Sequence, residues 1–192
     1  MKLNVVVLYG SVREGRQGIK AARFIVNKLK ERKHNVTFID PLEVKLPLLK
    51  KRYKDYPKGK APEKLDRLAK LYRKADAFVV VSAEYNHSIP PALSNLIDHF
   101  LEEYFFKPSL IVCYSAGSFG GVRASMQLRS MLAEVGMSSV KSIFAVPNVQ
   151  DAFDKKGSPK DFKSNERVKK PLDELEWYAE ALKEQRKKGT PY

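Results

Sequence analysis

Residues 3–10 have the sequence LNVVVLYG, which continues directly into SVREGRQG at residues 11–18. The first segment is continuously apolar and rich in valine, as expected of a strand buried on both faces of a parallel sheet. After the glycine-rich turn, apolar residues recur at helical spacing with charged residues between them: Ile19, Ala22, Val26 and Leu29. This strand–turn–helix unit predicts an α/β fold.

The same alternation of short apolar runs and longer amphipathic segments continues along the chain. Further strands are predicted at 36–40, 77–82, 109–115 and 140–146, and helices at 63–74, 91–104, 121–136 and 172–182. Two segments rich in proline, glycine or lysine, 41–60 and 151–170, are predicted to be loops. The pattern therefore predicts one α/β domain over residues 1–192, a doubly wound five-stranded parallel sheet with helices on both faces.

Composition limits the classes of ligand and partner. The 36 Lys and Arg residues exceed the 22 Asp and Glu residues, and the resulting net charge of +14 attracts anions. Nucleic acid is disfavoured as a partner because the basic residues are spread over the chain and form no basic arm. Cys113 is the only cysteine and there are three histidines, so neither a disulfide nor a metal site is predicted. No stretch reaches membrane-spanning length, and a cytoplasmic protein without a membrane partner is expected.

Three predicted loops lie where an open parallel sheet binds its ligands, beyond the carboxyl ends of the strands. They are rich in glycine, small polar and aromatic residues, and they occupy 10–18 after the first strand, 83–90 after the third and 115–121 after the fourth. The strands that lead into these loops are apolar. We therefore expect the functional site where the three loops meet.

The loop at 10–18 offers donors for a phosphate group. Backbone N–H groups at a helix N-terminus, the Ser11 hydroxyl and the guanidinium groups of Arg13 and Arg16 together favour an anion. An ordinary tight strand-to-helix turn explains the glycines equally well. A P-loop is disfavoured because Arg16 and Gln17 stand where its Lys and Ser/Thr belong, and the dinucleotide fingerprint is absent because Val12 replaces its second glycine.

The other two loops carry groups suited to a flat heteroaromatic ring. Glu84, Tyr85 and Asn86 combine an aromatic ring with a carboxylate and an amide, although the same residues could simply form a turn that covers the core. Glycines in the loop 115–121 allow close approach to the backbone, whose N–H groups suit the carbonyl edge of a flavin ring. Arg123, just beyond this loop, faces either an anionic second substrate or a surface carboxylate.

Taken together and in this order, the three loops resemble the motifs of the NADPH-dependent FMN reductase family, whose fold is flavodoxin-like. The matching stretches are GSVR at 10–13, EYNHSIPPALSN at 84–95 and GSFGG at 117–121. The resemblance covers residues 3–147, and its second stretch is long and distinctive. The departures from the family pattern are Ala83 for Pro, Ser94 for Lys, and Gln17-Gly18 where a Ser is common.

The resemblance implies a sheet of strand order 2-1-3-4-5 that holds FMN noncovalently and takes electrons from NADPH or NADH. It also implies which residues bind the cofactor. The phosphate would be held by Ser11, Arg13 and the backbone of Gln17, Gly18 and Ile19. The ring and ribityl chain would contact Glu84, Tyr85, Asn86 and His87 on one side and Ser115, Gly117, Gly120 and Gly121 on the other. Members of the family form homodimers or homotetramers, so a homo-oligomer is expected.

These observations lead to the hypothesis of an NAD(P)H-dependent, FMN-containing oxidoreductase that reduces a flavin, a quinone or a similar small-molecule acceptor by hydride transfer through FMN. The cofactor supplies the chemistry, so no catalytic side chain is predicted, and His87 has no evident partner for acid–base catalysis. Two alternatives remain open: a flavodoxin-type electron carrier that barely oxidises NAD(P)H, and an anion- or nucleic-acid-binding α/β domain without flavin.

Overall fold

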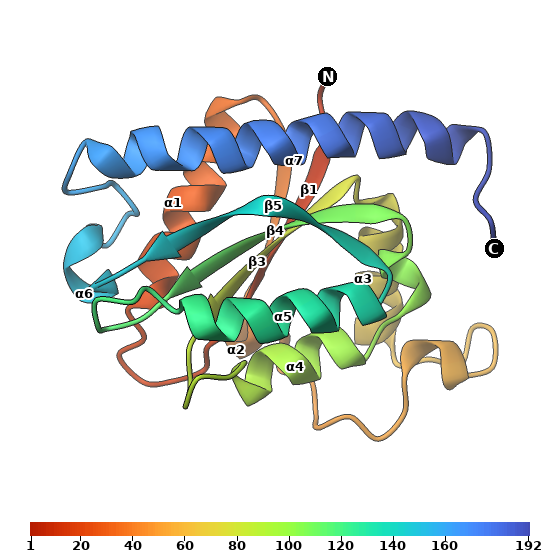
Figure 1. Ribbon diagram of the computed structural model, residues 1–192. Coiled ribbons are helices and arrows are strands. Elements are labelled where there is room, and N and C mark those ends of the chain that lie inside the picture. Colours follow the sequence, from red (N-terminus) through yellow and green to blue (C-terminus); the bar gives the residue numbers. More distant parts are fainter.

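The computed structural model describes residues 1–192 and contains one five-stranded sheet in the order β2-β1-β3-β4-β5. The strands are β1 (Asn4–Tyr9), β2 (Asn35–Ile39), β3 (Ala77–Ala83), β4 (Lys107–Tyr114) and β5 (Met137–Val146). Every neighbouring pair is parallel, so all the carboxyl ends lie at one edge of the sheet (Figure 1). The predicted fold class and strand order are confirmed.

Helices cover both faces of the sheet, because successive side chains of its central strands point to opposite faces. Val5 and Val7 of β1 belong to one buried cluster, with residues of α1 and α7, whereas Val6 and Leu8 belong to the other. The first layer consists of α1 (Gly18–Glu31) and α7 (Lys163–Lys187), and the second of α3 (Glu63–Lys74), α4 (Pro91–Asp98) and α5 (Val122–Glu134) (Figure 1). The strands β3 and β4 are buried along their whole length, which explains why both are mostly apolar, with only Ser82 in β3 and Lys107 and Ser109 in β4 as polar residues.

The helix predicted at 91–104 is shorter in the structure. It ends at Asp98, and Glu102–Tyr104 form a separate 3-10 turn. The carbonyl of His99 accepts a hydrogen bond of 2.8 Å from the backbone N–H of Tyr53, a residue distant in sequence. This tertiary contact occupies the end of the helix, and helical periodicity alone does not reveal it.

The segment 41–60, predicted to be a loop, contains two short helical elements. The helix α2 (Pro41–Val44) begins after Asp40, whose carboxylate accepts a hydrogen bond from the N–H of Leu42. A 3-10 turn follows at Tyr53–Asp55. The prediction was therefore wrong for these residues, because Asp followed by Pro is a helix N-terminus signal as well as a turn signal.

The helix α7 is longer than predicted and begins at Lys163, inside the segment 151–170 that the sequence predicts to be a loop. The short helix α6 (Val149–Ala152) occupies the start of that segment. Beneath its polar surface α7 carries a narrow buried stripe, made of Ser164, Val168, Pro171, Leu172, Leu175 and Ala179. Packing of this stripe outweighs the helix-breaking tendency of Pro171, so propensity alone gives the wrong prediction here. No helix, α7 included, is long and apolar enough to cross a membrane.

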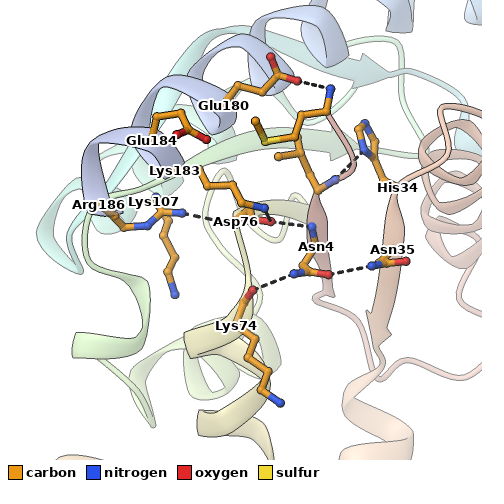
Figure 2. Close-up of polar contacts among 12 residues, drawn as sticks. Asn4, His34, Asn35, Lys74, Asp76, Lys107, Glu180, Lys183, Glu184 and Arg186 are labelled. Carbon is orange, nitrogen blue, oxygen red and sulfur yellow. Dashed lines mark hydrogen bonds and ion pairs between the residues drawn. The ribbon is translucent and has the colours of Figure 1, made fainter. Parts of the chain in front are cut away.

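Polar contacts fasten the C-terminal half of α7 to the amino-terminal edge of the sheet (Figure 2). The buried carboxylate of Asp76 accepts hydrogen bonds from the N–H of Asn4 at 2.8 Å and from Lys183 at 2.9 Å. Arg186 lies 3.6 Å from the other oxygen of the same carboxylate. These contacts hold the C-terminal half of α7 at the edge of the sheet opposite to the carboxyl ends of the strands.

Candidate functional site

A pocket of about 380 Å³ lies at the carboxyl edge of the sheet. Its walls come from the loop before α1, from the residues that follow β3 and β4, and from α6. The lining residues are Ser11, Arg13, Glu14, Gly15, Arg16, Gln17, Ala83, Glu84, Tyr85, Tyr114, Ser115, Ala116, Val149 and Gln150. The three loops singled out in the sequence therefore do meet at one pocket.

The corner of the pocket at the start of α1 is rich in hydrogen-bond donors. The helix has no side-chain cap and no acidic residue in its first turn, and the N–H groups of Gly18 and Ile19 have no intrahelical partner. The Ser11 hydroxyl lies 3.2 Å from the Tyr85 hydroxyl, and the exposed guanidinium of Arg13 lies over the Tyr85 ring, 5.7 Å from its centroid. A helix N-terminus, a hydroxyl and a guanidinium at one corner suit a phosphate.

The second arginine of this loop, Arg16, is bound to the protein itself. Its guanidinium donates to both carboxylate oxygens of Asp40, at 2.6 and 2.5 Å, and to the carbonyl of Ser11 at 2.9 Å. It also lies over the ring of Tyr9, 5.2 Å from the centroid. The hydrogen bond from Arg16 to Asp40 raises the pKa of the guanidinium above its ordinary value. Arg16, which the sequence offers as a phosphate donor, therefore shapes the loop.

The loop after β3 contains a tight two-residue turn. Tyr85 and Ser88 exchange two backbone hydrogen bonds, of 3.0 and 2.8 Å, and the residues between them have positive φ, 50° at Asn86 and 62° at His87. This is the geometry of a type I′ turn. The amide of Gln127 on α5 holds the turn, accepting from the Ser88 hydroxyl at 2.6 Å and donating to the His87 carbonyl at 3.0 Å. Asn86 and His87 thus form the tip of the turn and do not line the pocket.

Glu84 lines the pocket and also caps α5. Its carboxylate accepts hydrogen bonds from the backbone N–H groups of Arg123, at 3.0 Å, and Ala124, at 3.1 Å. The Arg123 guanidinium lies 3.8 Å from the second oxygen and over the ring of Phe119, 4.3 Å from its centroid. Of the two interpretations of Arg123, the structure contains the contact with a protein carboxylate.

The loop after β4 brings Ser115 into the pocket and places its glycines behind it. The Ser115 hydroxyl donates to the carbonyl of Gly117 at 2.9 Å. Gly120 and Gly121 have φ of 64° and 81°, and a Cβ at Gly121 would lie 2.8 Å from the backbone of Tyr114. These three glycines do not line the pocket. The positive φ of Gly120 and Gly121 allows the loop to close against the ends of β5 and β4.

Sequence reasoning missed several lining residues, most clearly Tyr114, Val149 and Gln150. Val149 and Gln150 follow β5, so the carboxyl-end rule would have found them if it had been applied to the fifth strand. The side chain of Gln150 donates to the carbonyl of Ala116 at 3.3 Å, and its buried Oε1 has no hydrogen-bond partner. Tyr114 is the last residue of an apolar strand, where nothing in the sequence distinguishes it from core.

Comparison with known proteins identifies the chain at the level of its family. Residues 3–151 match the family model described as NADPH-dependent FMN reductase. The chain belongs to this family. The match spans the sheet through β5 and the start of α6, and so includes all the residues that line the pocket.

The chain is also similar to two curated proteins and to one solved structure. An NAD(P)H-dependent FMN reductase of Pseudomonas aeruginosa is 31% identical over 127 residues, which cover 64% of this chain and 69% of that protein. A quinone reductase of Escherichia coli is 33% identical over 135 residues, which cover 68% and 70% of the two chains. The flavoenzyme FerB, an NAD(P)H:(acceptor) oxidoreductase from Paracoccus denitrificans, shares the fold with a TM-score of 0.71 over 95% of this chain and 98% of its own, at 24% identity.

The donors and acceptors of the pocket fit the FMN of this family. The corner at α1 offers free helix N–H groups, the Ser11 hydroxyl and the Arg13 guanidinium to a phosphate. The unpartnered Oε1 of Gln150 is an acceptor that a ribityl hydroxyl would satisfy. The volume of about 380 Å³ is also within the range of small-molecule sites.

Proposed function

We propose that the protein is an NAD(P)H-dependent oxidoreductase that binds FMN in this pocket and reduces a flavin, a quinone or a similar small-molecule acceptor. The observation that carries the proposal is the uncapped N-terminus of α1 beside Ser11 and Arg13, in a chain of the FMN reductase family. The net charge of +14 supports an anionic electron donor such as NADPH, because it raises the local concentration of anions.

The residues of the pocket would divide the work of holding the cofactor. The phosphate would be bound by Ser11 and Arg13, which line the pocket, and by backbone N–H groups at the start of α1. Of the N–H groups expected there, Gln17 belongs to the lining, and Gly18 and Ile19 do not. When bound, FMN supplies the two-electron chemistry between the pyridine nucleotide and the acceptor. Tyr85 and Glu84 would form one wall, and Ser115 the other. The carbonyl of Gly117 accepts the Ser115 hydroxyl, and Gly120 and Gly121 let the loop pack closely against the strand ends. The turn at Asn86 and His87, clamped by Gln127, would border the ring.

An absorption spectrum of the purified protein, reconstituted with FMN, tests the proposal. We expect a flavin band that bleaches when NADPH is added anaerobically and returns when a quinone is added. A protein that takes up no FMN would contradict the proposal. A flavodoxin-type carrier would take up FMN but give negligible steady-state oxidation of NAD(P)H, which separates it from the enzyme.

The assembly and location of the protein are further parts of the proposal. A homodimer or homotetramer is supported by large apolar side chains that stand exposed in the loop after β4 and on α7, such as Phe119 at 61% and Trp177 at 67%. Light scattering coupled to size-exclusion chromatography measures the assembly directly, and a monomer with full activity would contradict this part. A cytoplasmic location stays a prediction, which cell fractionation tests.

A further inference from the structure

The ring of Tyr114, the last residue of β4, packs against Gly18 in the first turn of α1. A Cβ placed on Gly18 would lie 1.9 Å from Cζ of Tyr114 and 2.3 Å from its hydroxyl oxygen. No side chain larger than hydrogen at position 18 leaves room for this ring. The ring of Tyr114 is therefore packed directly against the N-terminus of α1, the part of the pocket where helix N–H groups are free.

The Tyr114 hydroxyl belongs to a small group of hydroxyls at this corner. It lies 3.3 Å from the hydroxyl of Tyr9, while the hydroxyls of Ser11 and Tyr85 lie 3.2 Å from each other. Tyr114 lines the pocket, whereas Tyr9 is fully buried behind it. Burial raises the pKa of both Tyr9 and Tyr114, so both hydroxyls keep their protons near neutral pH.

We propose that the hydroxyl of Tyr114 is a hydrogen-bond donor to the phosphate of FMN, and that Gly18 is present to admit its ring. This inference rests on the proposed function, because it names a further residue of the same site. It also explains how the corner recognises an anion although Arg16 is bound to Asp40. Hydroxyl donors take the place that a second free guanidinium would fill.

The hydroxyl of Tyr9 allows this donation without leaving a buried group unsatisfied. Tyr114 donates to Tyr9 in the structure. When Tyr114 turns its proton toward a phosphate oxygen, Tyr9 donates to the oxygen of Tyr114 in return. The two hydroxyls then form a chain that ends on the anion, and each bond of such a chain strengthens the next.

The test compares FMN with riboflavin, which has the same ring and ribityl chain but no phosphate. Dissociation constants are measured by flavin fluorescence for the apo-protein and for Tyr114→Phe. We expect the substitution to weaken FMN by about tenfold to a hundredfold, the effect of one hydrogen bond to a charged group, and to change riboflavin by less than about threefold. Equal losses for both ligands, or no loss for FMN, would overturn the inference.

Two further variants distinguish direct contact from an effect on packing. Tyr104→Phe removes a buried hydroxyl that donates to the carbonyl of Ile97, outside the pocket, and it should weaken FMN by less than about threefold. A loss as large as that of Tyr114→Phe would place the effect in the core and refute the contact. Gly18→Ala, which displaces the ring of Tyr114, should reproduce the selective loss of FMN affinity. Urea unfolding verifies that this variant is folded.

If the unaltered protein binds no FMN, the proposed function fails and the inference fails with it. If it binds FMN but Tyr114→Phe does so equally well, the inference alone fails.

Discussion

Replacing Arg16 by Met should destabilise the protein, and the effect on FMN affinity should be secondary. The substitution keeps most of the side-chain volume but removes the guanidinium that joins the loop before α1 to the start of α2. Three hydrogen bonds are lost, two to the Asp40 carboxylate and one to the carbonyl of Ser11. Asp40 keeps only the backbone N–H of Leu42 as a partner for its carboxylate.

The size of the effect follows from the burial of the pair. The side chain of Asp40 is 3% exposed and that of Arg16 is 17% exposed. Breaking a buried pair by removing one partner costs about 3–5 kcal/mol, because a charge is left without compensation. Since Arg16 keeps some contact with water, we take the lower end, about 3 kcal/mol, which lowers the Tm by about 6–12 °C for a chain of this length.

Urea unfolding of the FMN-free protein measures this cost without the stabilisation that a bound ligand adds. In Asp40→Asn the cap of α2 is preserved, and the double variant with Arg16→Met removes both charges. We expect the double variant to be no less stable than Arg16→Met alone, so the coupling energy is at least as large as the cost of Asp40→Asn alone. As a control, Lys187→Met breaks an exposed pair with Glu184 and should change stability by less than about 0.5 kcal/mol. If Arg16→Met unfolds like the unaltered protein but loses FMN affinity, Arg16 is a phosphate ligand and our reasoning is wrong.

Three other predictions concern parts of the fold outside the phosphate corner. Asp76→Asn removes the charge that holds Lys183, and we expect a loss of about 1–3 kcal/mol in unfolding free energy with faster amide exchange in the C-terminal half of α7; unchanged exchange there would contradict the anchoring role. Burial lowers the pKa of the Lys107 ammonium group from 10.5 to about 7. Between these two pH values the unfolded chain holds one proton more than the folded protein, so the unfolding free energy rises with pH there. The difference in unfolding free energy between the unaltered protein and Lys107→Met should grow by about 1.4 kcal/mol per pH unit between pH 7 and 9. A difference that does not change with pH would show that Lys107 stays charged in the folded protein. Gln127→Ala frees the turn that carries His87, and it should weaken FMN and riboflavin alike while changing stability by less than about 1 kcal/mol; a loss confined to FMN would contradict this.

The sheet and the position of the site could be predicted from the sequence because they depend on local signals. The strand β3 is apolar except for Ser82, the pattern expected of a strand buried on both faces. The rule that ligands bind beyond the carboxyl ends of parallel strands then selects the loops after β1, β3 and β4. The pocket does lie there, and the rule would have included Gln150 after β5 as well.

What the sequence could not reveal is which partner each polar side chain takes. Arg13 and Arg16 stand three residues apart in one loop, and only the position of Asp40 at the end of β2 determines that Arg16 turns inward. The carboxylate of Glu84 is likewise taken up by the N-terminus of α5. Such pairings depend on contacts between residues far apart in sequence, as does the early start of α7, where buried packing overrides an internal proline.

These pairings change the physical picture of the site from a cluster of charges to a set of oriented donors. A chain with a net charge of +14 could hold a phosphate by charge alone, but at this corner the fold neutralises Arg16 with Asp40 and leaves Arg13 exposed to water. Exposed charges are screened by salt and contribute little selectivity. Helix N–H groups and buried hydroxyls are directional, and they act only on an oxygen placed within hydrogen-bond distance. If the proposed phosphate site is right, selection of FMN over riboflavin would depend on how this loop is held, with the Arg16–Asp40 pair joining it to the start of α2 and Gly18 admitting the ring of Tyr114.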